Sequence, residues 1–240
     1  MVWMYPVIML SAILVAAVLV RRNQSGLPLS FREKLVIGLG AFCGAMIGAK
    51  LPFALSDWEG VLDGTTWFSN GKTILFGLVG GYFGVELAKW MLGVRIKTGD
   101  TFAVPVPLAV GIGRLGCFVV GCCYGIPSAL PWAVVFPFVD SEPRHPTQIY
   151  ESLFHLLAAG VLAWLQDQGA FRGQLIKLYI ISYLIYRFFS ELIRPEVRLW
   201  AGLTGYQWAC LLLIGLFVWL WQRDRKWLAE NSVVVGGQGT

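Results

Sequence analysis

Residues 101–125 read TFAVPVPLAVGIGRLGCFVVGCCYG, a stretch of apolar residues and glycine with one charged side chain, Arg114. The stretch is long enough to cross a bilayer as a helix, which takes about 20 residues. A charge at the centre of a bilayer costs about 3 kcal/mol on insertion scales. Arg114 lies near the middle of the stretch, too far from either end to reach the headgroups easily. We therefore expect it to face a polar cavity that holds an anion.

The whole sequence has the composition of an integral membrane protein. Of its 240 residues, 57% are hydrophobic and 14% are charged, whereas a soluble domain carries about 25% charged residues. We predict an all-α polytopic membrane protein with about seven transmembrane helices. The candidate spans are residues 2–20, 35–55, 74–94, 101–123, 147–165, 174–193 and 205–221.

One membrane domain accounts for residues 1–222, with an outer loop over residues 126–146 that covers the candidate site. The first span has no charged segment before it and no small-residue cleavage site after it, which favours a retained anchor over a cleaved signal peptide. Residues 223–240 are expected to form a cytoplasmic tail, disordered from residue 231 onward.

The positions of lysine and arginine predict the topology, because cytoplasmic loops carry an excess of both. Alternate segments between the spans carry ten positive charges, at residues 21, 22, 32, 34, 95, 97, 172, 223, 225 and 226. The opposite set carries four, at residues 72, 144, 194 and 198. This places the N-terminus outside and the C-terminus in the cytoplasm. The net charge of +5 follows from topology, so no nucleic-acid partner is expected.

Local patterns predict helix ends and helix packing. Ser30 and Glu33 have the spacing of a capping box. Gly40, Gly44 and Gly48 share one helical face, and glycines 77, 80, 81 and 84 repeat this spacing in the next span, which favours close helix packing in lipid. Glu86 and Lys89 are expected to form a local pair, and Lys177 to extend towards the cytoplasmic headgroups.

The sixth span carries a row of charges. Arg187, Glu191 and Arg194 are spaced i, i+4, i+7 and are expected to share one helical face, where Glu191 can hydrogen-bond either arginine. Ionisable residues inside spans are usually functional. Together with Arg114, this row predicts an anion site, and the planar guanidinium group suits phosphate. In a membrane, the expected phosphate is a lipid headgroup.

Polar side chains also crowd the predicted mouth of the fifth span, after a proline-rich loop of restricted conformation. They are Arg144, His145, Gln148, Tyr150 and Glu151. A lone histidine is more often structural, and we assign His155 that role. His145, between an arginine and a proline, has either a structural role or a role in the site.

In order along the chain, these motifs resemble the prolipoprotein diacylglyceryl transferase family. Its glycine–arginine segment and Pro-Trp pair correspond to residues 113–132 (GRLGCFVVGCCYGIPSALPW), and its Arg-His-Pro motif to residues 144–151 (RHPTQIYE). Its Arg-x3-Glu-x2-Arg motif corresponds to residues 187–194 (RFFSELIR), and Gly205-Tyr206-Gln207 is similar to its closing Gly-Gln. The resemblance covers residues 50–207.

The resemblance implies a reaction in the bacterial cytoplasmic (inner) membrane. A diacylglyceryl group moves from phosphatidylglycerol to the lipobox cysteine thiol of a secreted precursor, and glycerol phosphate leaves, without a cofactor or a metal. Arg114 and Arg187 would bind the phosphate and stabilise the leaving group, while Glu191 would orient the arginines. Arg194 would lie at the external opening of the site. His145 or Glu151 is the candidate base. The positions implied for substrate binding are Arg194, Arg144, Tyr150, Glu151, Gln148, Cys117, Gly125 and Gln207.

The sequence departs from the family pattern at three places. Cys117 replaces an asparagine, Cys122 (followed by Cys123) replaces a glutamate, and Leu75 stands where the family has a histidine. A diverged paralogue that modifies another acceptor therefore remains an alternative. So does a transport or lipid-binding protein without chemistry, although the chain lacks the internal repeats of many transporters.

The cysteines themselves leave two interpretations open. They are either small apolar residues that fill a helix, or thiols that face the lipid site and accept a group or sense redox state. No disulfide framework is expected, and the sequence near the cluster offers too few ligands for zinc.

Overall fold

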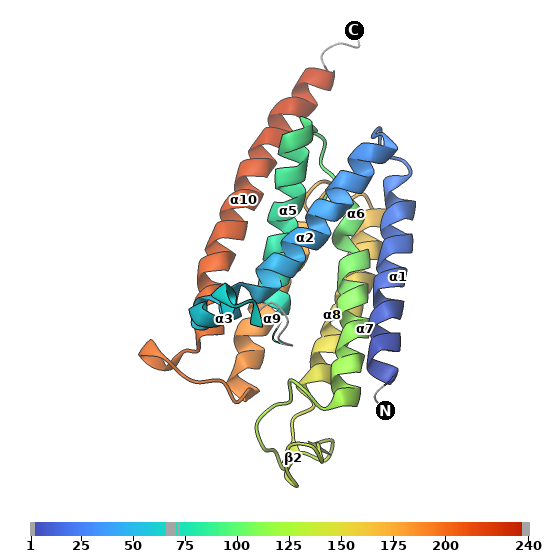
Figure 1. Ribbon diagram of the computed structural model, residues 1–240. Coiled ribbons are helices and arrows are strands. Elements are labelled where there is room, and N and C mark those ends of the chain that lie inside the picture. The colour runs from blue at the N-terminus through green and yellow to red at the C-terminus, as the bar shows by residue number, and fades with distance from the viewer. Residues whose placement is uncertain (1–2, 66–70, 72, 237–240) are drawn as a thin grey trace. The chain divides into compact units, whose positions relative to one another are not determined.

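The computed structural model describes residues 3–65, 71 and 73–236, and the side chains of these residues except Ser56 and residues 227–236. The chain divides into two compact units, Met1–Val20 with Asp100–Thr240 and Arg21–Gly99, which are described separately. The helices are α1 (Met4–Gln24), α2 (Phe31–Ser56), α3 (Trp58–Leu62), α5 (Ile74–Leu92), α6 (Asp100–Ala103), α7 (Pro105–Val120), α8 (Thr147–Asp167), α9 (Leu175–Ser190) and α10 (Gly205–Gly236), with two 3-10 helices, Glu191–Ile193 and Trp200–Gly202 (Figure 1).

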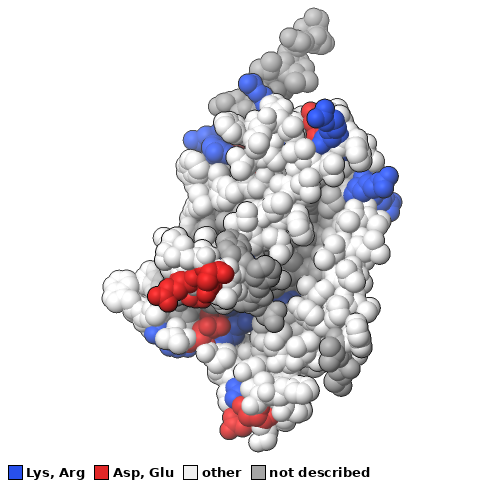
Figure 2. Space-filling model, viewed as in Figure 1, with Lys and Arg blue, Asp and Glu red and all other residues white. Residues whose placement is uncertain are grey.

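Six helices among the described residues are long and apolar enough to cross a membrane, which confirms an all-α polytopic membrane protein. They are Met4–Gln24, Phe31–Leu55, Ile74–Leu92, Asp100–Val120, Thr147–Asp167 and Gly205–Lys226. The seventh expected span corresponds to α9, whose 16 residues are fewer than the roughly 20 needed to span. Figure 2 shows uncharged surface along the helices, as lipid contact requires. The orientation in the membrane remains a prediction.

In the unit Arg21–Gly99, α2 and α5 pack through their glycines, as expected. A Cβ atom on Gly40 would lie 2.6 Å from the backbone oxygen of Gly84, so only glycine allows the two backbones to approach this closely. The capping box of Ser30 and Glu33 begins α2. Lys89 pairs with Glu86 at 2.9 Å. All three predictions are confirmed.

In the other unit, α7 lies beside both α1 and α8 (Figure 1). Cβ atoms on Gly111 and Gly116 would lie 3.1 Å from Leu156 of α8 and 3.3 Å from Tyr5 of α1. Ser152 Oγ donates to the Gly111 carbonyl at 2.8 Å. Small residues on two faces of α7 thus hold this helix, and the arginine it carries, against both neighbours.

Helix α9 packs on α10 through a buried ion pair. Lys177 Nζ donates to Asp224 Oδ2 at 2.7 Å and to Gln174 Oε1 at 2.5 Å. The expectation that Lys177 reaches the headgroups was wrong, because α10 supplies a carboxylate inside the protein. Helix α10 also continues to Gly236, so the predicted disorder was wrong for residues 231–236. Residues 237–240 lie outside the described residues, and the cytoplasmic location of residues 223–240 stays a prediction.

The span that contains Arg114 is shorter and less regular than expected. It consists of α6 and α7, and α7 begins at Pro105, a residue type suited to the first turn of a helix. Gly121 adopts the left-handed conformation (φ 77°) and ends α7, its N–H donating to the Cys117 carbonyl at 3.0 Å. Arg114 is therefore within about two turns of the helix end. Its expected place in the middle of the span was wrong.

The outer loop contains the sheet among the described residues. Strands β1 (Val134–Val135) and β2 (Pro143–Arg144) pair antiparallel, with Val134 opposite Arg144 and Val135 opposite Pro143. In Figure 1, this loop lies at the same end of its unit as the N-terminal end of α1, whereas the C-terminal end of α10 is at the opposite end. The loop connects the end of α7 to the start of α8.

Candidate active site

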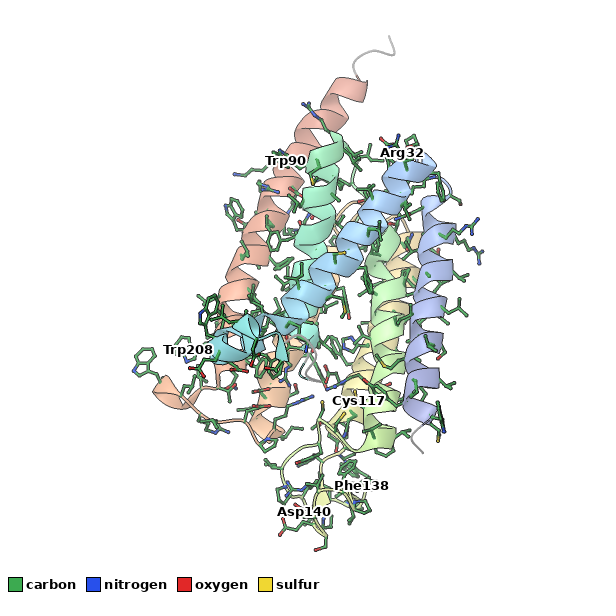
Figure 3. The ribbon with its side chains drawn as sticks, in the orientation of Figure 1. Arg32, Trp90, Cys117, Phe138, Asp140 and Trp208 are labelled. Atoms are coloured by element: carbon green, nitrogen blue, oxygen red, sulfur yellow. The ribbon has the colours of Figure 1, made fainter. Side chains whose placement is uncertain are left out.

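The candidate site lies where the end of α7, the start of α8 and the end of α9 meet. In Figure 3, Cys117 lies where α7 runs into the loop that carries Phe138 and Asp140. The end of α7 presents Arg114 and Cys117, and the first turns of α8 present Glu151. The segment after α9 adds Glu191 and Arg194, so residues far apart in sequence share this end of the unit.

Glu151 is the centre of the charged cluster. It forms ion pairs with Arg114 and with Arg194, the latter at 2.8 Å. Tyr183 Oη of α9 donates to the other carboxylate oxygen, Oε1, at 2.7 Å. The side chains of Arg114, Glu151 and Arg194 are only 6%, 2% and 8% exposed. Glu151 was expected to bind substrate or act as a base, and the structure makes it the shared counter-ion of two arginines.

A second ion pair joins Arg187 and Glu191. Their side chains are 2.7 Å apart and nearly fully buried. Thr204 Oγ1 donates to Glu191 Oε1 at 3.1 Å, and the Arg187 guanidinium lies 4.9 Å from the centre of the Tyr206 ring, within cation–π range. These contacts fix Arg187 in place, as expected of an arginine that Glu191 orients.

Arg194 departs from the expected row. Helix α9 ends at Ser190, residues Glu191–Ile193 form a 3-10 turn, and Arg194 is extended (φ −108°, ψ 148°). Arg194 therefore does not share a helical face with Arg187, and its partner is Glu151. The physical reason is Pro195, because the residue before a proline is disfavoured in the helical conformation. The extended backbone directs Arg194 towards α8.

The cluster keeps unused donors for an anion. It contains three guanidinium groups, of Arg114, Arg187 and Arg194, and two carboxylates, of Glu151 and Glu191. Within the described part of the chain, the buried atoms Arg114 Nε, Arg187 Nη1 and Arg194 Nε have no hydrogen-bond partner. Buried donors of this kind normally find a partner. The site therefore has one positive charge in excess and N–H groups to bind an anion.

Arg144 lies within the outer loop. It forms an ion pair with Asp140, donates to the Gly125 carbonyl at 3.4 Å and lies 5.2 Å from the centre of the Tyr124 ring. The hydrogen bond from Arg144 lowers the pKa of Asp140. Figure 2 shows acidic and basic side chains together at this loop. These contacts hold the loop together and do not bring Arg144 to the cluster around Glu151.

His145 and Tyr150 lie at the base of the loop. His145 Nδ1 is 3.4 Å from Tyr150 Oη, which accepts a hydrogen bond from Trp132 Nε1 at 2.7 Å. The Gly125 N–H donates to the His145 carbonyl at 2.9 Å. A Cβ atom on Gly125 would lie 2.7 Å from both His145 Cβ and the Ile193 carbonyl oxygen. Gly125 thus allows the loop to approach the segment after α9.

The two glutamines predicted at the site, Gln148 and Gln207, bind backbone groups. Gln148 Nε2 donates to the Cys122 carbonyl at 2.6 Å. Gln207 accepts from the Thr204 N–H at 3.0 Å and donates to the Phe188 carbonyl at 3.1 Å. The oxygen and the nitrogen of the Gln207 side-chain amide are thus both used in joining α9 to the start of α10, beside Thr204, which also contacts Glu191. Gln148 instead holds the cysteine segment against the start of α8.

Three cysteines gather beside Arg114. The Sγ atoms of Cys117, Cys122 and Cys123 all lie within 4.8 Å of one another, and Arg114 Nη1 donates to Cys117 Sγ at 3.7 Å. Cys117 and Cys122 are half-buried and Cys123 is exposed. The interpretation of these cysteines as buried apolar filling of a helix was wrong for Cys122 and Cys123, because α7 ends at Val120.

Sequence reasoning missed two tyrosines. Tyr183 contacts Glu151, and Tyr179 Oη lies 2.9 Å from Nδ1 of the fully buried His155, whose Nε2 is 3.8 Å from Glu151 Oε1. The spacing of these residues along their helices could have indicated their place in the site. Tyr183 precedes Arg187 by four residues and His155 follows Glu151 by four, so each shares a helical face with a predicted site residue.

Comparison with known proteins agrees with the motifs at this site. The family model described as prolipoprotein diacylglyceryl transferase matches residues 1–223. The chain belongs to this family. The charged cluster is formed by residues from the segments that carried the resemblance, namely Arg114, Glu151, Arg187, Glu191 and Arg194. The six membrane-capable helices found among the described residues agree with a multi-pass membrane transferase.

Several curated relatives are similar over most of the chain. A phosphatidylglycerol–prolipoprotein diacylglyceryl transferase of Clostridium tetani is 35% identical over 197 residues, covering 76% of this chain and 78% of the relative. The transferase 2 of Clostridium perfringens is 31% identical, covering 71% of each chain. The enzyme of Polynucleobacter asymbioticus is 32% identical over a segment that covers 75% of this chain and 74% of the relative. No solved structure matches the chain.

Proposed function

We propose that this protein transfers a diacylglyceryl group from phosphatidylglycerol to the lipobox cysteine thiol of a secreted prolipoprotein, at the outer face of the bacterial inner membrane. The observation that carries the proposal is the buried arginine cluster around Glu151, whose unused N–H groups can bind a phosphodiester. Membership of the family supports the same reaction.

The charged cluster suits the leaving group of this reaction. When the bond between the glyceryl carbon and the phosphate oxygen breaks, negative charge grows on that oxygen. Guanidinium groups already fixed in a dry site stabilise such charge without reorganising. Arg114 is held by Glu151 and Arg187 by Glu191, so both are positioned before substrate enters. We assign Arg114 and Arg187 to the phosphate.

The same charge favours the nucleophile. A thiol attacks as its thiolate, and nearby positive charge lowers the free energy of the thiolate. The site lies at the loop end of the helices, where a lipobox cysteine on the external side of the membrane can reach it. His145 lies at the base of this loop beside Tyr150, a place from which it can contact the incoming peptide. Both features support a thiol acceptor.

The direct test uses the purified chain in phosphatidylglycerol nanodiscs labelled in the acyl chains, with a lipobox peptide as acceptor. We expect label on the cysteine of the peptide and none on a peptide in which serine replaces that cysteine. Absence of label, under conditions in which a relative such as the Clostridium tetani enzyme works, would overturn the proposal. Label on another lipid or protein with unchanged lipoproteins would favour a paralogue with a different acceptor.

The site assignment has its own test. Arg114→Ala should lower the transfer rate by about 100-fold or more, the usual loss when one charge-stabilising donor is removed. The control is Arg32→Ala, which removes an exposed arginine at the start of α2 and should leave the rate unchanged. Gel filtration of both variants checks folding. A folded Arg114→Ala protein with full activity would contradict the placement of phosphate at this cluster.

A further inference from the structure

The three thiols at the end of α7 are brought together by a specific backbone path. Gly121 ends the helix in the left-handed conformation, and the Cys122 N–H then donates to the Cys117 carbonyl at 3.1 Å. Cys123 also has a left-handed backbone (φ 61°), which is uncommon for a residue other than glycine. The chain thus turns back on α7 and places all three sulfur atoms on one side of the turn.

The first turn of α8 holds this arrangement from outside. Thr147 Oγ1 donates to the Cys123 carbonyl at 2.6 Å, and Gln148 Nε2 donates to the Cys122 carbonyl at 2.6 Å. Both donors are buried. Each of the two loop cysteines therefore has its backbone fixed by a side chain of another helix, and the sulfur cluster does not depend on the loop alone. This preorganisation is typical of a built ligand site.

The geometry fits a tetrahedral metal ion with one position open. A zinc ion bound by three thiolates at about 2.3 Å holds their sulfur atoms about 3.8 Å apart. The three Sγ atoms lie within 4.8 Å of one another, so small side-chain rotations complete the set. Among the residues that the structure describes, no histidine, cysteine, aspartate or glutamate joins the group as a fourth ligand. The expectation of too few ligands for zinc applies to a closed site with four protein ligands, whereas three protein ligands and an open position are the pattern of catalytic zinc sites.

Charge and access agree with such a site. Three thiolates and Zn²⁺ carry one net negative charge, and Arg114 Nη1 donates a hydrogen bond to the Cys117 sulfur at 3.7 Å. Cys123 is exposed, and Cys117 and Cys122 are half-buried, so a thiol from outside can reach the open position. Thiolate ligands select zinc over the oxygen-seeking ions magnesium and calcium.

We propose that Cys117, Cys122 and Cys123 bind one Zn²⁺ as thiolates and leave its fourth position for the thiol of the acceptor cysteine. The role of the open position rests on the proposed transferase function. The acceptor thiol loses its proton to water as it binds. Its sulfur lone pair then forms the bond to the glyceryl carbon, and the carbon–oxygen bond breaks with its electron pair passing to glycerol phosphate beside Arg114. No oxidation or reduction is involved.

The metal is tested without reference to activity. The full chain, purified in detergent without added metal, should contain about one zinc per chain by elemental mass spectrometry. After replacement by Co²⁺, it should show the charge-transfer absorption of cobalt–thiolate bonds. Cys122→Ser and Cys123→Ser should lose the metal, while Cys43→Ser, which changes an exposed cysteine of α2, should keep it. No zinc, copper in its place, or a disulfide among the three cysteines would overturn the site.

The open position is tested by adding acceptor to the cobalt form. A lipobox peptide should shift the visible cobalt bands, and the serine peptide should not. Removal of zinc from the intact chain by a chelator should abolish transfer and added Zn²⁺ should restore it, a test that does not depend on folding of the variants. Equal transfer by metal-free protein would overturn the inference and leave the transferase function intact. Bound zinc without any transfer to the peptide would overturn the function and leave the metal site.

Discussion

At the scale of single residues, Glu151 explains how arginines remain charged inside a membrane protein before any lipid binds. A buried guanidinium group needs a partner because its desolvation is expensive. Glu151 supplies one carboxylate to both Arg114 and Arg194, and Tyr183 donates to its second oxygen. The carboxylate leaves part of each guanidinium group unused. The cluster is thus stable without substrate and still able to bind phosphate.

Glu151→Gln tests this role, since glutamine keeps the size of the side chain and removes its charge. Loss of one partner of a buried ion pair typically costs about 3–5 kcal/mol, so we expect a clear fall in the thermal unfolding temperature in detergent, followed by tryptophan fluorescence, and reduced transfer. Glu142→Gln is the matched control, because the side chain of Glu142 is 61% exposed and its change should have no measurable effect. Equal unfolding temperatures for the two variants would argue against Glu151 as the shared counter-ion.

The sequence predicted the charged residues of the site better than their partners. Arg114, Arg187 and Glu191 were identified because charges inside spans are rare, and the local Arg187–Glu191 pair followed from helical spacing. The pairing of Glu151 with Arg114 joins residues 37 positions apart, which no local pattern encodes. Arg194 was wrongly expected to share the helical face of Arg187 and Glu191, because its spacing was weighed without Pro195. A proline signal of this kind is available from sequence alone.

At the scale of elements, helix interiors and several helix starts were predictable, whereas the ends of α7 and α9 were not. Hydrophobic length located every long helix, but α7 ends at Val120 and α9 at Ser190, although the sequence stays mostly apolar beyond both residues. Hydrophobicity records only that a segment is buried in lipid or protein. The end of a helix depends on backbone preferences such as the left-handed conformation of Gly121. The end of α7 determines the structure of the site, because Cys122 and Cys123 lie beyond the helix and in the turn that follows it.

The contact of α2 with α5 gives an element-scale prediction. A Cβ atom on Gly40 would lie 2.6 Å from the Gly84 carbonyl oxygen and 2.8 Å from Ala88 Cβ, so Gly40→Ala must push the helices apart. We expect a loss of about 1–3 kcal/mol, the usual cost of overpacking, seen as a lower unfolding temperature. Gly38→Ala on the same helix meets nothing within 4 Å and should be neutral or slightly stabilising. The same response from both variants would mean that helix propensity, not packing, decides these positions.

At the scale of the whole molecule, the predicted orientation would place the candidate site and the basic end of α10 on opposite sides of the membrane. The arginine cluster and the cysteines lie at the loop end of their unit, which carries the N-terminal end of α1, while α10 runs to the opposite end (Figure 1). The lysines and arginines near the end of α10, at residues 223, 225 and 226, belong to the set that the positive-inside rule assigns to the cytoplasm. In this predicted orientation, an acceptor that has crossed the membrane would meet the site on the external side.

Cysteine labelling can decide this orientation. Phe138→Cys introduces a thiol in the outer loop, where Phe138 is 85% exposed, and Arg225→Cys introduces one at the exposed surface of α10 beyond its most apolar part. Relative to the parent chain, we expect a membrane-impermeant maleimide to label the first variant in intact spheroplasts and the second only after lysis. Because the positive-inside rule responds to lysine and arginine and little to acidic residues, replacing Arg223, Arg225 and Lys226 together by glutamine should weaken this preference. The reverse labelling pattern would place the arginine cluster on the cytoplasmic side, where a secreted acceptor could not reach it after export.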